Sequence, residues 1–147
     1  MIEGLQYIKV VKAYFDFLIA EFDFKVSDEK IRGNAFYDIQ YRDLKKVVSI
    51  SYENIEDYLL VIVFMLQNGE LPDYDDKTKT LHLSQLNAKV FSQVNEEGIK
   101  VNDEHFLKFK ANNEFERKLL KSAKELRLCL KYWPLISPPH WSEVVVK

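Results

Sequence analysis

Residues 35–66 read AFYDIQYRDLKKVVSISYENIEDYLLVIVFML and decide the fold of this chain. Apolar and polar side chains alternate over 35–41 and again over 47–53, which is the pattern of strands with one buried face. The run 58–66 is apolar on both faces, so we expect a central strand or one that is covered on both sides. The links between these runs are short enough for hairpins. The stretch therefore predicts three antiparallel strands in a meander.

Helical periodicity precedes the meander. Residues 2–22 carry apolar side chains at helical spacing over a surface broader than one stripe. We expect one long helix here that is packed on two sides or offers aromatic side chains to a partner. Residues 24–26 can add a short strand before a turn at 32–34. After the meander, 67–77 is the longest clear loop.

Further helices are expected after this loop. One covers 84–94 and is ended by Gly98, and Asp103 then caps a short turn. The last helix begins after Asn112 or Asn113. Its buried stripe consists of Phe115, Leu119, Ala123, Leu126, Leu130 and Trp133. The order of elements predicts an α+β domain, in which an antiparallel three- to four-stranded β-meander packs against an N-terminal helix and C-terminal helices.

Length and composition indicate one folded domain. The chain has 147 residues, and ~150 residues is a common size for a single domain. Its 47% hydrophobic and 14% aromatic content excludes a disordered chain. We place the domain at 1–133 and expect an extended tail at 134–147, because Pro134 stops the last helix. In that tail, 144–146 is a candidate late edge strand.

Several classes of function are disfavoured by composition. The net charge of −2 argues against a general nucleic-acid binder. The single cysteine, Cys129, excludes an intramolecular disulfide and is expected to be a buried helical thiol. The chain lacks the basic start of a signal peptide, and its longest apolar run is far shorter than the ~20 residues that span a bilayer. We therefore expect a cytoplasmic protein without a membrane partner.

Motifs that would carry chemistry are missing from the sequence. There is no nucleophile elbow, no helical histidine pair for zinc and no glycine-rich phosphate loop. Residues 73–76, Asp-Tyr-Asp-Asp, come nearest to a metal loop, but Thr78 and Ser84 occupy the positions where a calcium loop has Gly and Glu. The sequence therefore predicts no catalytic residue, no metal ligand and no cofactor.

The charge pattern points to a protein partner. Residues 47–76 contain no Lys or Arg, whereas 117–131 contain six bases and one acid. Such asymmetry steers association and rejects surfaces of like charge. The acidic residues of the first stretch are Glu53, Glu56, Asp57, Glu70, Asp73, Asp75 and Asp76. Together with Tyr74 as an aromatic anchor, they are the predicted binding residues for a partner with a basic surface.

A family resemblance makes this expectation more specific. With an aromatic first helix, a Phe-Asp-Phe exit at 22–24, a Tyr-rich meander and an acidic loop, the chain resembles small bacterial immunity proteins that neutralise polymorphic or contact-dependent toxins. The resemblance implies binding of a cognate toxin domain, often a basic nuclease, through an acidic or aromatic surface. The matching positions are Glu53, Glu56, Asp57, Asp73, Tyr74, Asp75 and Asp76.

Our leading hypothesis is therefore a non-enzymatic protein-binding domain, with an immunity role as its most concrete form. Two alternatives stay open. One is a metal-dependent enzyme that uses the clustered carboxylates. The other is a structural subunit that forms a homodimer through its first helix.

Overall fold

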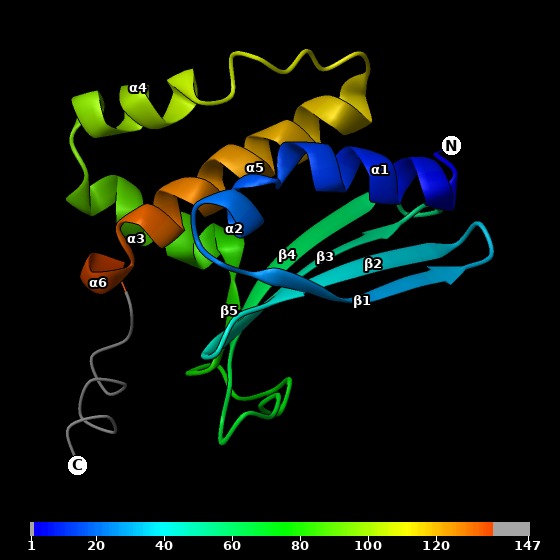
Figure 1. Cartoon of the computed structure of the whole chain (residues 1–147), viewed down its shortest axis with the longest axis horizontal. Coiled ribbons are helices and arrows are strands. Elements are labelled where there is room, and N and C mark those ends of the chain that lie inside the picture. The colour runs from blue at the N-terminus through cyan, green and yellow to red at the C-terminus, as the bar shows by residue number, and fades with distance from the viewer. Residues whose placement is uncertain (1, 137–147) are drawn as a thin grey trace.

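A five-stranded antiparallel sheet with its strands in chain order forms one layer of the molecule, and the helices lie over one of its faces (Figure 1). The computed structural model describes residues 2–136. The strands are β1 Lys25–Arg32, β2 Phe36–Arg42, β3 Lys46–Glu53, β4 Tyr58–Met65 and β5 Thr80–His82. The helices are α1 Gly4–Tyr14, α2 Phe17–Ala20, α3 Leu83–Gln93, α4 Glu96–Glu104, α5 Glu114–Lys131 and α6 Trp133–Ile136. The predicted α+β class and antiparallel meander are confirmed.

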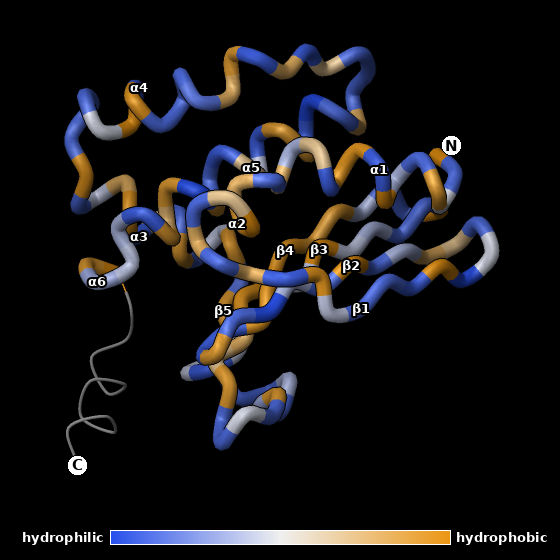
Figure 2. The backbone as a smooth tube through the Cα atoms, in the orientation of Figure 1, coloured by the Kyte–Doolittle hydropathy of each residue, from blue (hydrophilic) through white to orange (hydrophobic). Residues whose placement is uncertain are grey.

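The core lies between the sheet and the helices α1 and α5. The Tyr7 hydroxyl of α1 donates a buried hydrogen bond of 2.6 Å to the Ile50 carbonyl of β3. On α5, Phe115 packs edge-on against Tyr52, with 4.7 Å between the ring centroids. Leu119 and Leu126 are fully buried, as the predicted stripe requires. In Figure 2, β4 is hydrophobic along most of its length, in keeping with its apolar sequence.

The predicted long first helix is broken into α1 and α2. The break falls at Phe15 and Asp16, after the Phe15 amide has donated to the Val11 carbonyl. Phe15 and Phe17 are both buried, although a straight helix would direct them about 200° apart. The break lets both rings enter the core. The aromatic side chains of this segment are therefore part of the core, packed on two sides, and do not form an exposed dimer face.

The predictions for residues 95–109 were wrong in detail. Gly98 does not end a helix but lies within the first turn of α4, which Asn95 caps by accepting from the Gly98 amide at 2.9 Å. A Cβ at Gly98 would lie 2.8 Å from the Tyr132 hydroxyl, so close packing explains this glycine. Asp103 lies near the end of α4 and does not cap a helix start. Asn113 does cap α5, as predicted, by accepting from the Glu116 amide.

The two ends of the sheet differ from the prediction. β1 is eight residues long, where a three-residue strand was expected. Its side chains are mostly exposed and charged, because it is an edge strand, so they show no apolar alternation. β5 was not predicted, and it pairs with β4 only from Ile62 to Phe64. β4 is therefore central over three residues only.

The last described residues also differ from the expected extended tail. Trp133–Ile136 forms α6, and Ile136 is buried in the core. Pro134 is accommodated because the first turn of a helix does not use its backbone N–H groups in intrahelical bonds. The rest of the expected tail, including the edge strand proposed at 144–146, lies outside the described residues.

Candidate functional site

One face of the sheet lies opposite the helices. Within residues 2–136 no helix covers it (Figure 1). Because side chains alternate along a strand, the residues next to the buried ones point to this face. On β3 and β4 these residues are Val47, Ser49, Ser51, Glu53, Tyr58, Leu60, Ile62 and Phe64. Val47, Ser49 and Ile62 are buried, and the others are partly or fully exposed. We call this surface the open face.

The predicted binding residues form two clusters at opposite ends of β4. The hairpin cluster, between β3 and β4, consists of Glu53, Glu56 and Asp57. The loop cluster, between β4 and β5, consists of Glu70, Asp73, Tyr74, Asp75 and Asp76. Since a strand rises ~3.3 Å per residue, the length of β4 separates the clusters by roughly 25 Å. The open face of β4 connects them.

In the hairpin cluster, the carboxylates have different surroundings. Glu53 is exposed and lies between Phe36 and Tyr58 in the strand register, all three on the open face. Asp57 accepts from the Tyr52 hydroxyl at 2.6 Å and from Lys118 Nζ at 2.9 Å. These hydrogen bonds, that from Tyr52 first, lower the pKa of the Asp57 carboxyl. Asp57 is therefore already engaged within the domain, whereas Glu53 presents its charge to solvent.

Asn54 fixes this hairpin to the body of the domain. Its side-chain amide donates to the Ile2 and Asn34 carbonyls, each at 2.8 Å, and to the Tyr37 hydroxyl at 2.8 Å. The residue is buried, although it sits in a turn. The bonds join the hairpin to the N-terminal segment and to the turn between β1 and β2.

A tight turn starts the loop cluster. Asn68 and Gly69 both have positive φ, 52° and 80°, which is the conformation of a type I′ turn. Gln67 and Glu70 exchange two backbone hydrogen bonds across it. Arg42 of β2 donates to the Gly69 carbonyl. The turn is therefore fixed to the sheet, and Glu70 is exposed beside it.

The rest of the loop is braced by its own polar groups. Asp76 accepts from the Thr78 amide at 3.0 Å and from the Thr78 hydroxyl at 2.5 Å. Thr80 Oγ1 donates to the Asp73 carbonyl at 2.9 Å. The Tyr74 ring lies edge-on to His82, 6.3 Å between centroids, yet the residue stays 57% exposed. Tyr74 is thus an exposed aromatic side chain on an ordered loop, flanked by two exposed aspartates.

The opposite charges of the sequence meet in space. Three bases of α5 have acidic partners: Arg117 with Glu114, Lys118 with Asp57, and Arg127 with Glu21. Within α5, Lys121 and Lys131 are exposed. The basic run of the sequence therefore acts largely within the domain, and it neutralises part of the hairpin cluster.

The cysteine and the histidines of residues 2–136 lie apart from one another in the fold. No set of three or more His, Cys, Asp or Glu side chains within residues 2–136 is placed to hold a metal ion. Cys129 is buried, and burial raises the pKa of its thiol to about 12. His82 lies against Tyr74 and His105 lies 3.9 Å from Glu21, while His140 is outside the described residues. None of the helices described is long and apolar enough to cross a membrane.

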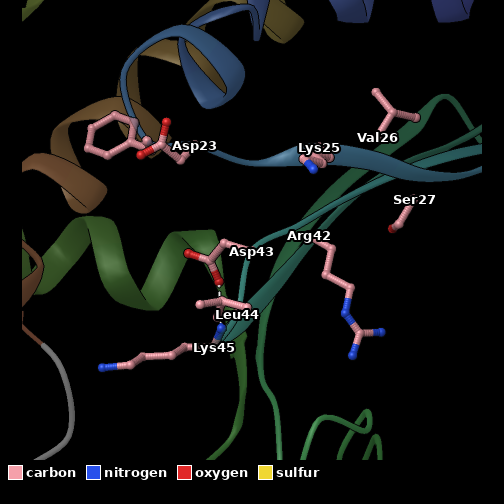
Figure 3. Close-up of a pocket in the computed structure, with 9 residues that line it drawn as sticks. Asp23, Lys25, Val26, Ser27, Arg42, Asp43, Leu44 and Lys45 are labelled. Atoms are coloured by element: carbon pink, nitrogen blue, oxygen red, sulfur yellow. Dashed lines mark hydrogen bonds between the residues drawn. The ribbon is translucent and has the colours of Figure 1, made fainter.

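A hollow of about 770 Å³ lies between the start of β1 and the β2–β3 turn (Figure 3). Lys25, Arg42 and Lys45 line it. Figure 3 shows the Arg42 and Lys45 side chains pointing away from each other. Asp43 is occupied in the turn itself, where it accepts from the Lys45 amide at 2.8 Å. The hollow therefore has no converging charges for an anion.

The open face also holds a residue that the sequence did not single out. Asp38 of β2 is only 6% exposed there, and it accepts from Ser49 Oγ at 2.8 Å and from Gln40 Nε2 at 3.2 Å. Burial raises the pKa of its carboxyl, an effect that these two hydrogen bonds oppose. An Asp at a polar position of an alternating strand is expected to face solvent, so the alternation of apolar and polar residues does not predict that Asp38 is buried.

Comparisons with models of known protein families, with curated proteins and with solved structures find no match for this chain.

Proposed function

We propose that this protein is a non-enzymatic cytoplasmic binding protein that recognises another protein through the open face. One observation carries the proposal: exposed tyrosines stand at both ends of the open face, each beside carboxylates. Tyr58 is 52% exposed and pairs in register with Glu53, and Tyr74 is 57% exposed between Asp73 and Asp75. Tyrosine anchors within a charged rim are the usual composition of protein interfaces.

The dimensions of the surface fit one partner. The stripe from Tyr58 to Phe64 is roughly 20 Å long at the rise of a β-strand. A standard interface covers ~800 Å² on each partner, so a single protein can contact both tyrosines. Leu60 and Phe64, which lie between them, are partly exposed apolar residues that such a contact would cover.

An immunity role is the most concrete form of this proposal. The carboxylates at both ends would pair with the Lys and Arg residues that a toxin uses on a nucleic acid, and binding would block that surface. Asp57 contributes least, because Lys118 already neutralises it. The expected contacts with the partner are therefore Glu53, Glu56, Tyr58, Glu70, Asp73, Tyr74 and Asp75.

Photo-crosslinking in the native host tests the proposal. A photoreactive phenylalanine analogue would replace Tyr58 or Tyr74 in turn, and Leu107 in a control that is more accessible, at 79% exposure, but outside the open face. We expect one protein to be crosslinked from both tyrosine positions and not from Leu107. The immunity role further expects that protein to be a toxin that loses activity in the complex. Equal labelling from Leu107, or no labelling from either tyrosine position, would refute the proposal.

A further inference from the structure

The lateral edge of β4 is open next to the hairpin cluster. β5 pairs only with Ile62–Phe64, so over residues 58–61 no strand of the described chain lies on that side. The Met65 amide donates to Lys79 on the β5 side, and the Leu66 amide donates to Lys45 on the β3 side. Because backbone groups alternate along a strand, those of Leu59 and Val61 also face the β5 side. This edge therefore directs strand-pairing groups towards a space that β5 does not fill.

A groove of about 410 Å³ runs along this edge. That volume falls in the range of ~300–1,000 Å³ that is typical of ligand pockets. The groove separates β4 from the helices α3 and α5. Its walls include Tyr58–Val61, His82, Ser84, Asn87, Lys121 and Glu125.

The groove contains a carboxylate without an ion pair. Glu125 is partly buried and accepts from Asn87 Nδ2 at 2.8 Å, and no cation of residues 2–136 forms an ion pair with it. Burial raises the pKa of its carboxyl, and Lys121 lowers it. A ligand that supplies charged donors would compensate for this burial of the carboxylate.

We propose that this edge binds an extended segment of a partner protein as an added strand, with one Arg side chain of that segment entering the groove and donating to the Glu125 carboxylate. Strand addition supplies backbone hydrogen bonds, and a pocket for one side chain supplies specificity. Arg fits because its planar group offers several donors, which can reach two acceptors at once. The inference rests on the proposed function, since it takes the partner to be a protein, but it uses the lateral edge of β4, which shares only Tyr58 and Leu60 with the open face.

The other edge of the sheet is protected against such pairing. β1 carries Lys, Asp, Glu and Arg side chains along its length, and its register with β2 is irregular between Val26 and Asp28. Charges and bulges are the usual devices that keep an edge strand from pairing. The uncovered part of β4, in contrast, contains Leu59, Leu60 and Val61, with no charged residue from 58 to 61.

Blocked peptides test the proposal on the full chain. The probe is acetyl-Thr-Val-Thr-Arg-Thr-Val-Thr-amide, and its control has citrulline, a neutral isostere, in place of Arg. Binding is followed by amide chemical shifts of the ¹⁵N-labelled protein. We expect the Arg peptide to shift the Leu59 and Val61 resonances and to bind at least tenfold more tightly than the citrulline peptide. This comparison uses the unaltered protein and does not depend on a variant that must fold.

Two variants test whether Glu125 causes the difference in affinity between the two peptides. Glu125→Gln should bring the affinities for the two peptides within about twofold of each other, while Glu104→Gln, on the exposed surface of α4, should leave the difference unchanged. Equal affinities for both peptides on the unaltered protein, shifts confined to other surfaces, or no shifts at millimolar peptide would overturn the proposal. These outcomes do not involve Tyr74, so crosslinking from Tyr74 would still support the open face as a binding surface.

Discussion

The two faces of the sheet show how one strand can serve stability and recognition separately. On β2, Tyr37, Ile39 and Tyr41 point to the helices and are completely buried. The residues between them, Asp38 and Gln40, point to the open face and make polar contacts with each other and with β3. Burial of apolar area is the main source of folding free energy. The helix-covered face therefore stabilises the fold, and residues of the open face are freer to contact a partner.

The largest change in stability is expected from a substitution on the helix-covered face of the sheet. Leu126 of α5 is completely buried, so Leu126→Ala removes buried methyl groups and leaves a cavity. Such a change should lower the free energy of unfolding by about 2–5 kcal/mol. Urea denaturation measures it. The matched control Leu107→Ala, at a residue that is 79% exposed, should stay within about 0.5 kcal/mol of the unaltered protein. A similar loss of unfolding free energy in both variants would show that Leu126 does not belong to the stabilising core.

A smaller loss is expected at the hairpin between the two faces. Asn54→Ala removes three hydrogen bonds that join the hairpin to Ile2, Asn34 and Tyr37. It leaves carbonyl groups that lose a donor, so we expect a loss of about 1–3 kcal/mol. Hydrogen exchange of the hairpin amides should also become faster. Unchanged exchange together with unchanged stability would mean that the hairpin is held by other contacts.

The sequence predicted those elements that have strong apolar patterns and missed those that tertiary contacts define. The meander and α5 could be predicted because their buried residues repeat with a period of two or 3.6. β1 was predicted only at its start and β5 not at all, because β1 is charged on an edge and β5 is three residues long. The break between α1 and α2 depends on where the Phe15 and Phe17 rings find space, and local pattern does not contain that information.

The candidate site was predicted in composition but not in arrangement. The acidic residues and Tyr74 were identified from charge and residue type alone. Their separation into two clusters depends on the length of β4 between them, and the pairing of Asp57 with Lys118 joins residues 61 positions apart. Asn87 and Glu125 were not singled out, since a single polar residue on a helix gives no sign of burial against another element.

On the open face itself, removal of a charge should produce a small gain. Burial raises the pKa of Asp38, so the folded protein holds this proton more tightly than the unfolded chain does. The contribution of Asp38 to stability is then largest below its unfolded pKa, near ~3.9, and is lost as pH rises through its folded pKa. Asp38→Asn cannot ionise. Its free energy of unfolding should exceed that of the unaltered protein at pH 7, and the difference should shrink towards pH 3. A loss that is the same at both pH values would show that the hydrogen bonds of the carboxylate outweigh its burial.

The smallest effect on stability, and the clearest effect on recognition, is expected in the loop cluster. Asp73 and Asp75 are exposed, whereas Asp76 braces the turn through Thr78. The double change Asp73→Asn with Asp75→Asn should therefore keep the free energy of unfolding within about 0.5 kcal/mol. It should slow association with the protein crosslinked from Tyr74 roughly two- to tenfold at low salt, because surface charge steers encounter. The deficit should shrink as salt rises, since the screening length is only ~8 Å at physiological ionic strength. Asp76→Asn serves as a contrast, because it should lower the free energy of unfolding by weakening the hydrogen bonds from Thr78 that hold the turn. If the double variant associates at the original rate with the original salt dependence, the carboxylates of Asp73 and Asp75 take no part in steering the partner to this loop.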